Sequence, residues 1–434
     1  MSGDGAPNMT PIGADETHCG WLVIGAGVVG LCTALRLRQA GHGVTLIDRR
    51  GIAAEASRGN AGALAYSDIL PLASPGILRQ APRWLLDPLG PLSLPPAYLP
   101  RILPWLWRFW RASQPAQVAA STRAQAALMR LAERETASLL QSINALDLLH
   151  TDGNLQLYES DAEWRASLPG WQLRADHGVA FEHLHGAPAL AALQPGLSPA
   201  LVAATFVPGW QRIEDPLLLC QRVAQAFEQL GGRLRLGDAK ALRAGADGID
   251  VPLASGQTLR ASRVVVASGA WSHHLARTLG DRLPLETERG YNTTLPPGAF
   301  DLRRQLTFGG RGFVVTPIGR GVRVGGAVEL GGLSAPPNYR RADALLAHAR
   351  RFLPALDVTG GTQWMGFRPS LPDSLPAIGA APSDARVVYA FGHGHLGLTQ
   401  AAATAALVVD VAAERATSVD LAPFSPARFG PGSR

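Results

Sequence analysis

The run Gly25-x-Gly27-x-x-Gly30 constrains this chain more than any other feature, because it directly follows an apolar segment at residues 21–24. In such a run the first glycine permits a tight turn, and the second lets the backbone approach a pyrophosphate. The third lets a helix pack closely against a strand. A helical pattern follows, and residues 43–48 have the composition of a strand. This order predicts a βαβ unit that binds a dinucleotide at the helix N-terminus.

Three charged residues end this unit, Asp48, Arg49 and Arg50. A carboxylate at the end of the second strand can accept a hydrogen bond from a ribose hydroxyl, so we expect Asp48 to bind the ribose. The two arginines alone would favour a 2′-phosphate, but Asp48 would repel that group. The motif, with Val28 and Val29 in its turn, therefore predicts a dinucleotide site and leaves NAD and FAD as alternatives.

The middle of the chain repeats the alternation of helix and strand. Asp215 and Pro216 indicate a helix start, since aspartate caps a first turn and proline suits the first helical position. We expect this helix to cover residues 217–230, with strands at 233–236 and 263–269. Such alternation is typical of a parallel sheet in the α/β class.

Other segments interrupt this alternation. Residues 312–317 and 321–328 flank a short turn and predict an antiparallel hairpin. Residues 119–146 indicate a long helix rich in Ala, Leu and Arg, and residues 401–409 indicate a buried one. We therefore expect a Rossmann-like domain built from discontinuous segments, and a substrate domain of α+β insertions that contains an antiparallel sheet and helices.

Composition excludes several classes of protein. The chain has 434 residues, too many for one compact core, and its 40 Lys and Arg residues include a single lysine, Lys240. No Walker A loop is possible without a lysine in that motif, and a Schiff-base lysine would have to be Lys240. The arginines are scattered and the net charge is only +6, so we expect no nucleic-acid partner.

Cysteine usage and hydropathy indicate the compartment. Three cysteines, Cys19, Cys32 and Cys220, do not make a disulfide framework, and their spacing matches no metal site. Residues 1–18 lack the pattern of a signal peptide, and no run of 18 apolar residues predicts a membrane span. These patterns favour a cytoplasmic protein.

Residues 84–111 are rich in Leu, Pro, Trp and Arg, and indicate a helix from about Pro104. Arg108 and Arg111 would share one face, with Leu106, Phe109 and Trp110 on or near the other. Such a helix suits contact with the inner membrane, with another subunit or with the protein's own core. The sequence favours packing on protein, either the protein's own core or another subunit, and leaves contact with the membrane open.

Five segments together give the chain a resemblance to a known family. It resembles the D-amino acid oxidase and glycine oxidase superfamily of flavoproteins, and most closely the bacterial D-amino acid and D-hydroxyproline dehydrogenases. Besides the first βαβ unit, the resemblance rests on residues 56–62, 264–272, 366–379 and 392–399. It implies FAD as the cofactor, without covalent attachment, because no cysteine lies at a matching loop.

The resemblance also assigns residues to FAD and divides the chain. The Ser-x-x-Asn-x-Gly loop would line the pyrophosphate and flavin, Ala239 would lie beside the adenine, and Gly269 would close over the cofactor. The predicted FAD-binding residues are Gly25, Gly27, Val28, Val29, Gly30, Asp48, Arg49, Arg50, Ser57, Asn60, Ala61, Gly62, Ala239, Gly269, Gly394, His395, Leu396, Gly397, Leu398 and Thr399. The expected division is a flexible extension at 1–19, an FAD-binding domain at 20–68, 205–282 and 360–415, a substrate domain at 69–204 and 283–359, and a loose tail at 416–434.

Three residues are candidates for catalysis. Arg368 matches the family's arginine for the substrate carboxylate, which a guanidinium binds through two parallel hydrogen bonds. Tyr291 matches a tyrosine near the substrate, with core packing as the alternative. His395, like His393, lies in the loop before the last long helix, where it would add charge or shape the pocket.

These observations predict a flavoenzyme that oxidises a D-amino acid or a cyclic D-imino acid. A hydride would pass from Cα to FAD, and the imino product would be hydrolysed or released. We expect a quinone or a partner protein to accept the electrons. An O₂-using oxidase of the glycine or sarcosine oxidase type, an FAD-carrying subunit of a heteromeric amine dehydrogenase, and an NAD-linked dehydrogenase remain alternatives.

Overall fold

The glycine-rich turn joins β2 (His18–Ile24) to α1 (Val28–Gln39) in the computed structural model, which describes residues 8–13, 15–74 and 89–430. β3 (Val44–Asp48) runs parallel to β2, with Ile24 beside Ile47. Alternate residues of β2 face two different apolar clusters, so that Val23 packs on one side and Leu22 on the other. The predicted βαβ unit is therefore confirmed.

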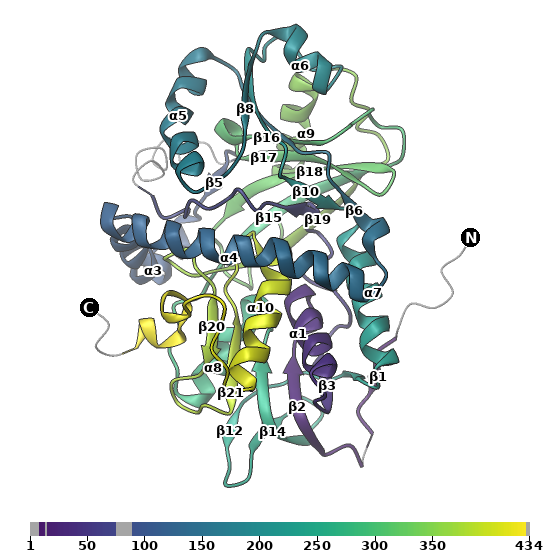
Figure 1. Cartoon of the computed structure of the whole chain (residues 1–434), viewed down its shortest axis with the longest axis vertical. Helices are drawn as coiled ribbons and strands as arrows, with labels where there is room; N and C mark the ends of the chain where they lie inside the picture. The colour runs from purple at the N-terminus through teal and green to yellow at the C-terminus, as the bar shows by residue number, and fades with distance from the viewer. Residues whose placement is uncertain (1–7, 14, 75–88, 431–434) are drawn as a thin grey trace.

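This unit lies at the centre of the first of two large sheets, in the lower half of Figure 1. Six strands of the sheet are parallel, and the edge beyond β14 is antiparallel. The neighbouring strands are β1 (Thr10–Pro11), β11 (Arg233–Leu236), β3, β2, β14 (Thr258–Val266), β13 (Ile249–Pro252) and β12 (Arg243–Ala244), while β21 (Val387–Phe391) pairs with β14 and β20 (Ala377–Ala380) with β21.

Helices cover both faces of this sheet. One face is covered by α1, α7 (Pro216–Gln229) and α10 (Gly397–Ala412), and the other by α8 (Ser272–Leu279). The Asp215 side chain caps α7 by accepting a hydrogen bond from the Leu217 N–H at 2.8 Å. The helix predicted at residues 217–230 is thus confirmed, and the predicted buried helix is α10.

A second large sheet occupies the upper half of Figure 1 and is mostly antiparallel. Its hairpin of β17 and β18 matches the hairpin predicted from the sequence. Along the sheet lie β19 (Thr362–Ser370), β15 (Glu286–Leu295), β18 (Gly321–Glu329), β17 (Phe313–Ile318), β16 (Gln305–Phe308), β7 (Asn154–Tyr158), β9 (Ala203–Val207) and β8 (Glu182–His185), while β5 (Leu92–Ser93) pairs with β18. The helices α5 (Asp161–Asp176), α6 (Ala187–Leu193) and α9 (Arg340–Phe352) lie around it.

Two elements connect the halves. A small antiparallel sheet consists of β4 (Ala63–Leu64), β10 (Gln211–Ile213) and β6 (Leu149–His150). The long helix α4 (Pro115–Ser142) crosses the middle of the molecule and contacts α10 (Figure 1). It begins and ends four residues earlier than the helix predicted at 119–146, because Pro115 suits its first turn.

The expected assignments of residues 360–415 and 1–19 need correction. The segment 360–415 was assigned to the FAD-binding domain, yet its first strand, β19, pairs with β15 in the other sheet. The extension at 1–19 was expected to be flexible, but β1 pairs with β11 and Glu16 forms an ion pair with Arg235 at 2.5 Å. These contacts order the described part of that segment.

The C-terminal tail is also better ordered than expected over its described residues, 416–430. Phe424 is fully buried in the cluster that contains α1 and α10. The Arg428 Nε donates to Asp373 at 2.7 Å, and Arg428 also donates to the Leu375 carbonyl. The tail therefore fastens the turn between β19 and β20. Residues 431–434 lie outside the described part of the chain.

The helix predicted near Pro104 is α3 (Leu99–Ala112). Its inner face, with Ile102 and Trp105, packs on Leu330, and its outer face exposes Leu103, Trp107 and Trp110. Trp110 therefore does not share the buried side with Phe109 as the sequence suggested. Residues 84–88 of the predicted contact segment lie outside the described residues. No helix in the described part of the chain could span a membrane.

Shortening Phe424 tests the anchoring of the tail. Because the ring is fully buried, Phe424→Ala should lower the free energy of unfolding by about 3–5 kcal/mol, as measured by urea denaturation. Ser418→Ala, at an exposed position of the same tail, is the matched control and should change stability little. Equal stability of both variants would show that the tail does not contribute to the core.

Candidate functional site

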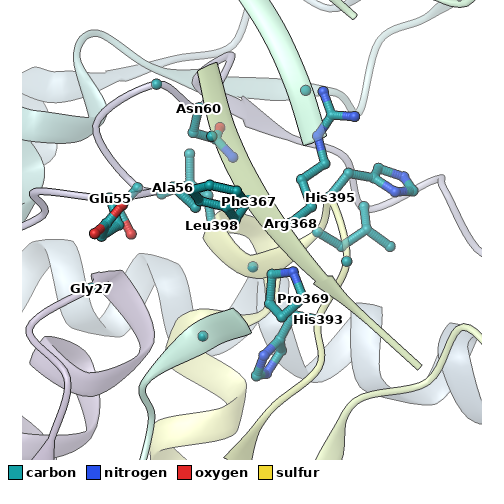
Figure 2. A pocket seen from close by; sticks show the side chains of 18 of the residues that line it. Gly27, Glu55, Ala56, Asn60, Phe367, Arg368, Pro369, His393, His395 and Leu398 are labelled. Carbon is teal, nitrogen blue, oxygen red and sulfur yellow. The ribbon is translucent and has the colours of Figure 1, made fainter. Parts of the chain in front are cut away.

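A cavity of about 780 Å³ extends between the two sheets. Most of the predicted site residues line it, namely Gly25, Gly27, Val28, Val29, Asp48, Arg49, Ser57, Asn60, Ala61, Ala239, Gly269, Tyr291, Arg368, Gly394, His395, Leu396, Gly397, Leu398 and Thr399. Gly30, Arg50 and Gly62 are adjacent in sequence to lining residues but do not line the cavity themselves. Figure 2 shows Gly27 and Glu55 on one side, with Arg368 and His395 together on the other.

The glycines of the first turn are required by close contacts. A Cβ on Gly30 would lie 1.8 Å from the Gly25 carbonyl oxygen. Gly25 has φ of +114°, and its Cβ would lie 2.5 Å from the Ala267 carbonyl oxygen. Side chains here would push α1 away from β2 and β14, so only glycine permits this turn.

The N-terminus of α1 opens toward the cavity. The N–H groups of a first helical turn have no acceptor within the helix. In α1 the Val28 N–H donates to the Ser57 Oγ at 2.9 Å. Val29, like Val28, lines the cavity there. Together with the positive end of the helix dipole, these groups fit the pyrophosphate of a dinucleotide.

The Asp48 carboxylate accepts more hydrogen bonds from the protein itself than the sequence suggested. Its Oδ2 accepts from the Ala26 N–H at 2.9 Å, and its Oδ1 accepts from the Arg50 and Gly51 N–H groups at 2.7 and 3.1 Å. Oδ2 still has a lone pair for a further donor, whereas both lone pairs of Oδ1 are in use. Asp48 thus holds the glycine-rich turn, and its contact with a ribose stays a prediction.

The far end of the cavity fits the adenosine part of a dinucleotide. Ala239 and Lys240 line it, and the Lys240 ammonium pairs with Asp238 at 2.6 Å. The Arg49 guanidinium lies 3.9 Å from the centre of the Trp271 ring. It also donates to Glu55 at 2.7 Å, so Arg49 is held against the cavity wall by both neighbours.

The Ser57–Gly62 loop is braced from the other sheet. The Asn60 Oδ1 accepts from the Gly62 N–H at 2.9 Å, and Gly62 has φ of +74°. Arg323, on β18, is nearly buried and donates to the carbonyls of Arg58 and Asn60. Burial lowers the pKa of Arg323, whose Nη1 donates to the loop carbonyls and whose Nε donates to the Thr294 hydroxyl.

The loop before α10 presents a second helix N-terminus to the cavity. Gly397 and Leu398, in its first turn, line the cavity wall. The Thr399 hydroxyl is used within the protein, because it donates to the Ala63 carbonyl and accepts from the Ala65 N–H. The backbone of this turn therefore supplies partial positive charge, while Thr399 fastens α10 to the loop at β4.

The two histidines of this loop differ. His393 is buried, its Nε2 is 2.9 Å from the Thr404 hydroxyl, and burial lowers its pKa to about 3. It is neutral at pH 7 and so adds no charge. The His395 Nε2 lies 3.2 Å from Asp68, which also pairs with Arg174 at 3.6 Å. Burial acts to raise the pKa of Asp68, but the hydrogen bond and charge of His395 and the Arg174 charge hold it below its ordinary value.

Arg368 lies on β19 with its guanidinium directly over Gly290 of β15. A Cβ on Gly290 would lie 2.3 Å from the guanidinium, so the glycine makes room for it. The Nη1 donates to the Ala327 carbonyl at 2.9 Å, which orients the group. Burial lowers the pKa of Arg368, and the nearby Glu288 carboxylate acts in the opposite direction. The remaining guanidinium donors are available to an anion in the cavity.

The Tyr291 hydroxyl, which the sequence matches to a tyrosine near the substrate, is hydrogen-bonded within the protein. It donates to Glu329 at 2.5 Å and accepts from the Asn338 N–H at 3.1 Å. Burial raises its pKa to about 12, and Glu329 contributes to the increase, so the phenol keeps its proton. Glu329 also pairs with the fully buried Arg289 at 2.9 Å. Tyr291 borders the cavity, but its side chain packs in the apolar cluster of the second sheet, and its single proton is committed to Glu329.

Sequence reasoning missed Glu288, Gly290 and Arg323, which also line the cavity. Gly290 lies beside the Tyr291 that the motif identified, and a glycine next to a predicted substrate residue was the available signal. Nothing in the local sequence distinguishes Arg323 from the other arginines. The pairing register of β18 places Arg323 against the Ser57–Gly62 loop.

The buried histidine predicts a pH dependence of stability. The folded protein has a His393 pKa of about 3 and the unfolded chain one near 6.5, so below about pH 6.5 only the unfolded chain takes up this proton. Wild-type stability should therefore fall between pH 7 and 4.5 by about 2–3 kcal/mol more than that of His393→Gln. Urea unfolding at both pH values measures the difference. Parallel losses in the two proteins would contradict a buried, neutral His393.

Comparisons with known proteins agree with this geometry. The family model described as FAD dependent oxidoreductase matches residues 21–411. A D-amino-acid oxidase of Bradyrhizobium diazoefficiens is 35% identical over 94% of this chain and 98% of its own. A D-amino acid dehydrogenase of Vibrio cholerae is 34% identical over 90% of this chain and 94% of its own.

Solved structures share the fold. Glycine oxidase from Geobacillus kaustophilus superposes with a TM-score of 0.77 at 21% identity, over 96% of this chain and all of its own. Iminodiacetate oxidase from Chelativorans superposes with a TM-score of 0.72 at 21% identity, over 94% of this chain and 98% of its own. The family match covers most of the chain, and the helix N-termini and glycine turn fit its cofactor. The chain therefore belongs to the DAO family of FAD-dependent oxidoreductases, and it is an enzyme that acts on amino acids.

Proposed function

We propose that this enzyme oxidises the Cα–N bond of D-amino acids or cyclic D-imino acids, of the D-alanine or the D-proline and D-hydroxyproline type, and passes the electrons to a quinone or a partner protein. Arg368 carries the proposal, because its guanidinium faces the cavity beside a glycine that makes room for it. A planar guanidinium suits a carboxylate, which every amino acid has.

Different groups around the cavity would carry out different parts of such a reaction. FAD, when bound, supplies the acceptor for the hydride from Cα. Arg368 would bind the substrate carboxylate and so orient the Cα–H bond. The N-terminus of α10 would stabilise negative charge that develops beside it. The substrate amine must be neutral when the hydride leaves, and no protein base at Cα is then required.

The nature of the acceptor has a specific alternative. One similar protein is named an oxidase and others are named dehydrogenases, so direct reaction with O₂ is the second candidate. An FAD-carrying subunit of a heteromeric amine dehydrogenase is the third. The three candidates differ in the route by which the electrons leave the flavin.

The visible spectrum of the purified holoenzyme tests the proposal. Under anaerobic conditions the flavin absorbance should bleach on adding D-alanine or D-proline, and should change little with the L-enantiomers. Flavin that no amino acid reduces would contradict the proposal and favour the subunit. On admitting air, stoichiometric peroxide would favour an oxidase, whereas slow reoxidation that a soluble quinone accelerates would favour a dehydrogenase.

Gly290→Ala tests whether the position of the Arg368 guanidinium matters for substrate binding. The added methyl group would displace the guanidinium, so KM for a D-amino acid should rise about tenfold or more while the flavin stays bound. Gly43→Ala, where a Cβ meets no atom within 4 Å, is the matched control and should leave KM unchanged. An unchanged KM in Gly290→Ala would contradict the assignment of Arg368.

We also propose that α3 contacts an anionic bilayer, where a quinone would be available. Leu99, Leu103, Trp107 and Trp110 form one exposed stripe, with exposed fractions of 41 to 54%. The helix contains three arginines and no acidic residue, and Arg111 lies over the Trp107 ring. An apolar stripe with tryptophan and flanking arginine is typical of an interfacial helix.

Vesicle binding tests the role of α3. The protein should sediment with vesicles that contain phosphatidylglycerol, and Trp107→Ala/Trp110→Ala should abolish this. Leu146→Ala/Leu230→Ala, at exposed leucines elsewhere, is the control and should still bind. Equal binding by both double variants, or a stable dimer that the tryptophan changes dissociate, would overturn the membrane assignment.

A further inference from the structure

Glu288 lies directly opposite Arg368 in the pairing of β15 with β19. Side chains of directly paired residues project from the same side of a sheet, with their Cβ atoms about 5 Å apart. Both residues line the cavity. The site therefore presents a carboxylate and a guanidinium side by side, on two rigid strands.

The Glu288 carboxylate has no partner among the described residues. The residue is only 6% exposed, yet no hydrogen bond or ion pair of its side chain to another described residue is present, and Arg368 lies beyond ion-pair distance. The neighbouring acids differ, since Glu286 accepts from the Tyr98 hydroxyl and Glu329 pairs with Arg289. A buried carboxylate without a partner is costly, so its retention at the cavity wall indicates a cationic ligand group.

Arg368 is also incompletely neutralised. Its one described acceptor is the Ala327 carbonyl, while Glu288 affects it only through charge. The guanidinium extends along β15 to Gly290, which lies two residues from Glu288. A gap thus remains between opposite charges, and a zwitterion with one carbon between its carboxylate and ammonium has the complementary pattern.

We propose that Glu288 binds the α-ammonium group of the substrate while Arg368 binds its carboxylate, so that the pair selects amino acids over carboxylates without an amine. This inference rests on the proposed function. It extends it by assigning the recognition of the amine to a residue of this chain. The ammonium would donate a charge-assisted hydrogen bond to the Glu288 carboxylate, and it would pass one proton to that carboxylate or to water before the hydride leaves.

Two ligands of similar size distinguish this role from a structural one. D-Alanine has the ammonium, and propionate lacks it. In Glu288→Gln the loss of charge should weaken D-alanine binding by about tenfold or more, because the partner of a buried charge is removed. Propionate should bind more tightly, because its carboxylate no longer meets a neighbouring negative charge at Arg368. A disrupted fold would weaken both ligands.

Propionate binding is measured by the perturbation of the flavin absorbance in anaerobic holoenzyme. D-Alanine binding is measured by the concentration dependence of the rate of anaerobic flavin reduction, or by the same perturbation if D-alanine does not reduce the flavin, with KM for D-alanine recorded in parallel. Glu286→Gln, two residues away and outside the cavity lining, is the matched control and should change neither affinity. Weaker binding of both ligands, or no change in either, in Glu288→Gln would overturn the proposal. An effect confined to D-lysine and D-arginine would also overturn it, by assigning Glu288 to the side chain.

This experiment separates the two proposals. If no amino acid reduces the flavin, the proposed oxidation fails, but the opposite shifts for alanine and propionate would still establish recognition of an ammonium by Glu288. If amino acids reduce the flavin and Glu288→Gln leaves both affinities unchanged, the oxidation stands and the role of Glu288 fails.

Discussion

The antiparallel pairing of β15 with β19 is the constraint on which the site depends. It places Arg368 opposite Glu288 and leaves Gly290 beneath the guanidinium. The strands come from distant parts of the chain, and the short connection after β19 leads directly into the first sheet through β20. The same pairing therefore sets the geometry of the charged residues and the position of the substrate half over the dinucleotide half.

Charge is distributed unevenly around the cavity. Arg289, Glu329 and Tyr291 form one buried group, in which the Arg289 Nη1 and the Tyr291 hydroxyl both donate to Glu329. Facing the cavity, Glu288 and Arg368 are held near each other without contact. A low dielectric strengthens the hydrogen bonds of the first group and raises the cost of leaving the charges of the second without a partner. The first makes the wall rigid, and the second keeps two opposite charges available to a ligand.

The sequence predicted elements whose signals are local. The glycine turn, the Asp215 cap and the hairpin of β17 and β18 each follow from neighbouring residues, and the structure contains them. It could not predict that β19 leaves the dinucleotide-binding half, because strand pairing depends on residues far apart in the chain. For the same reason Glu288 and Arg323 were missed, and the hydrogen bond of the Tyr291 hydroxyl to Glu329 could not be predicted.

The order of strands in the first sheet has a consequence for biosynthesis. β2 and β3 are made long before β14, and β21 follows later still. The early strands therefore expose unpaired edges during most of translation, which favours aggregation. Chaperone dependence, and failure of fragments that contain only the early strands to fold, are the expected cost of a nucleotide-binding sheet assembled from segments far apart in the chain.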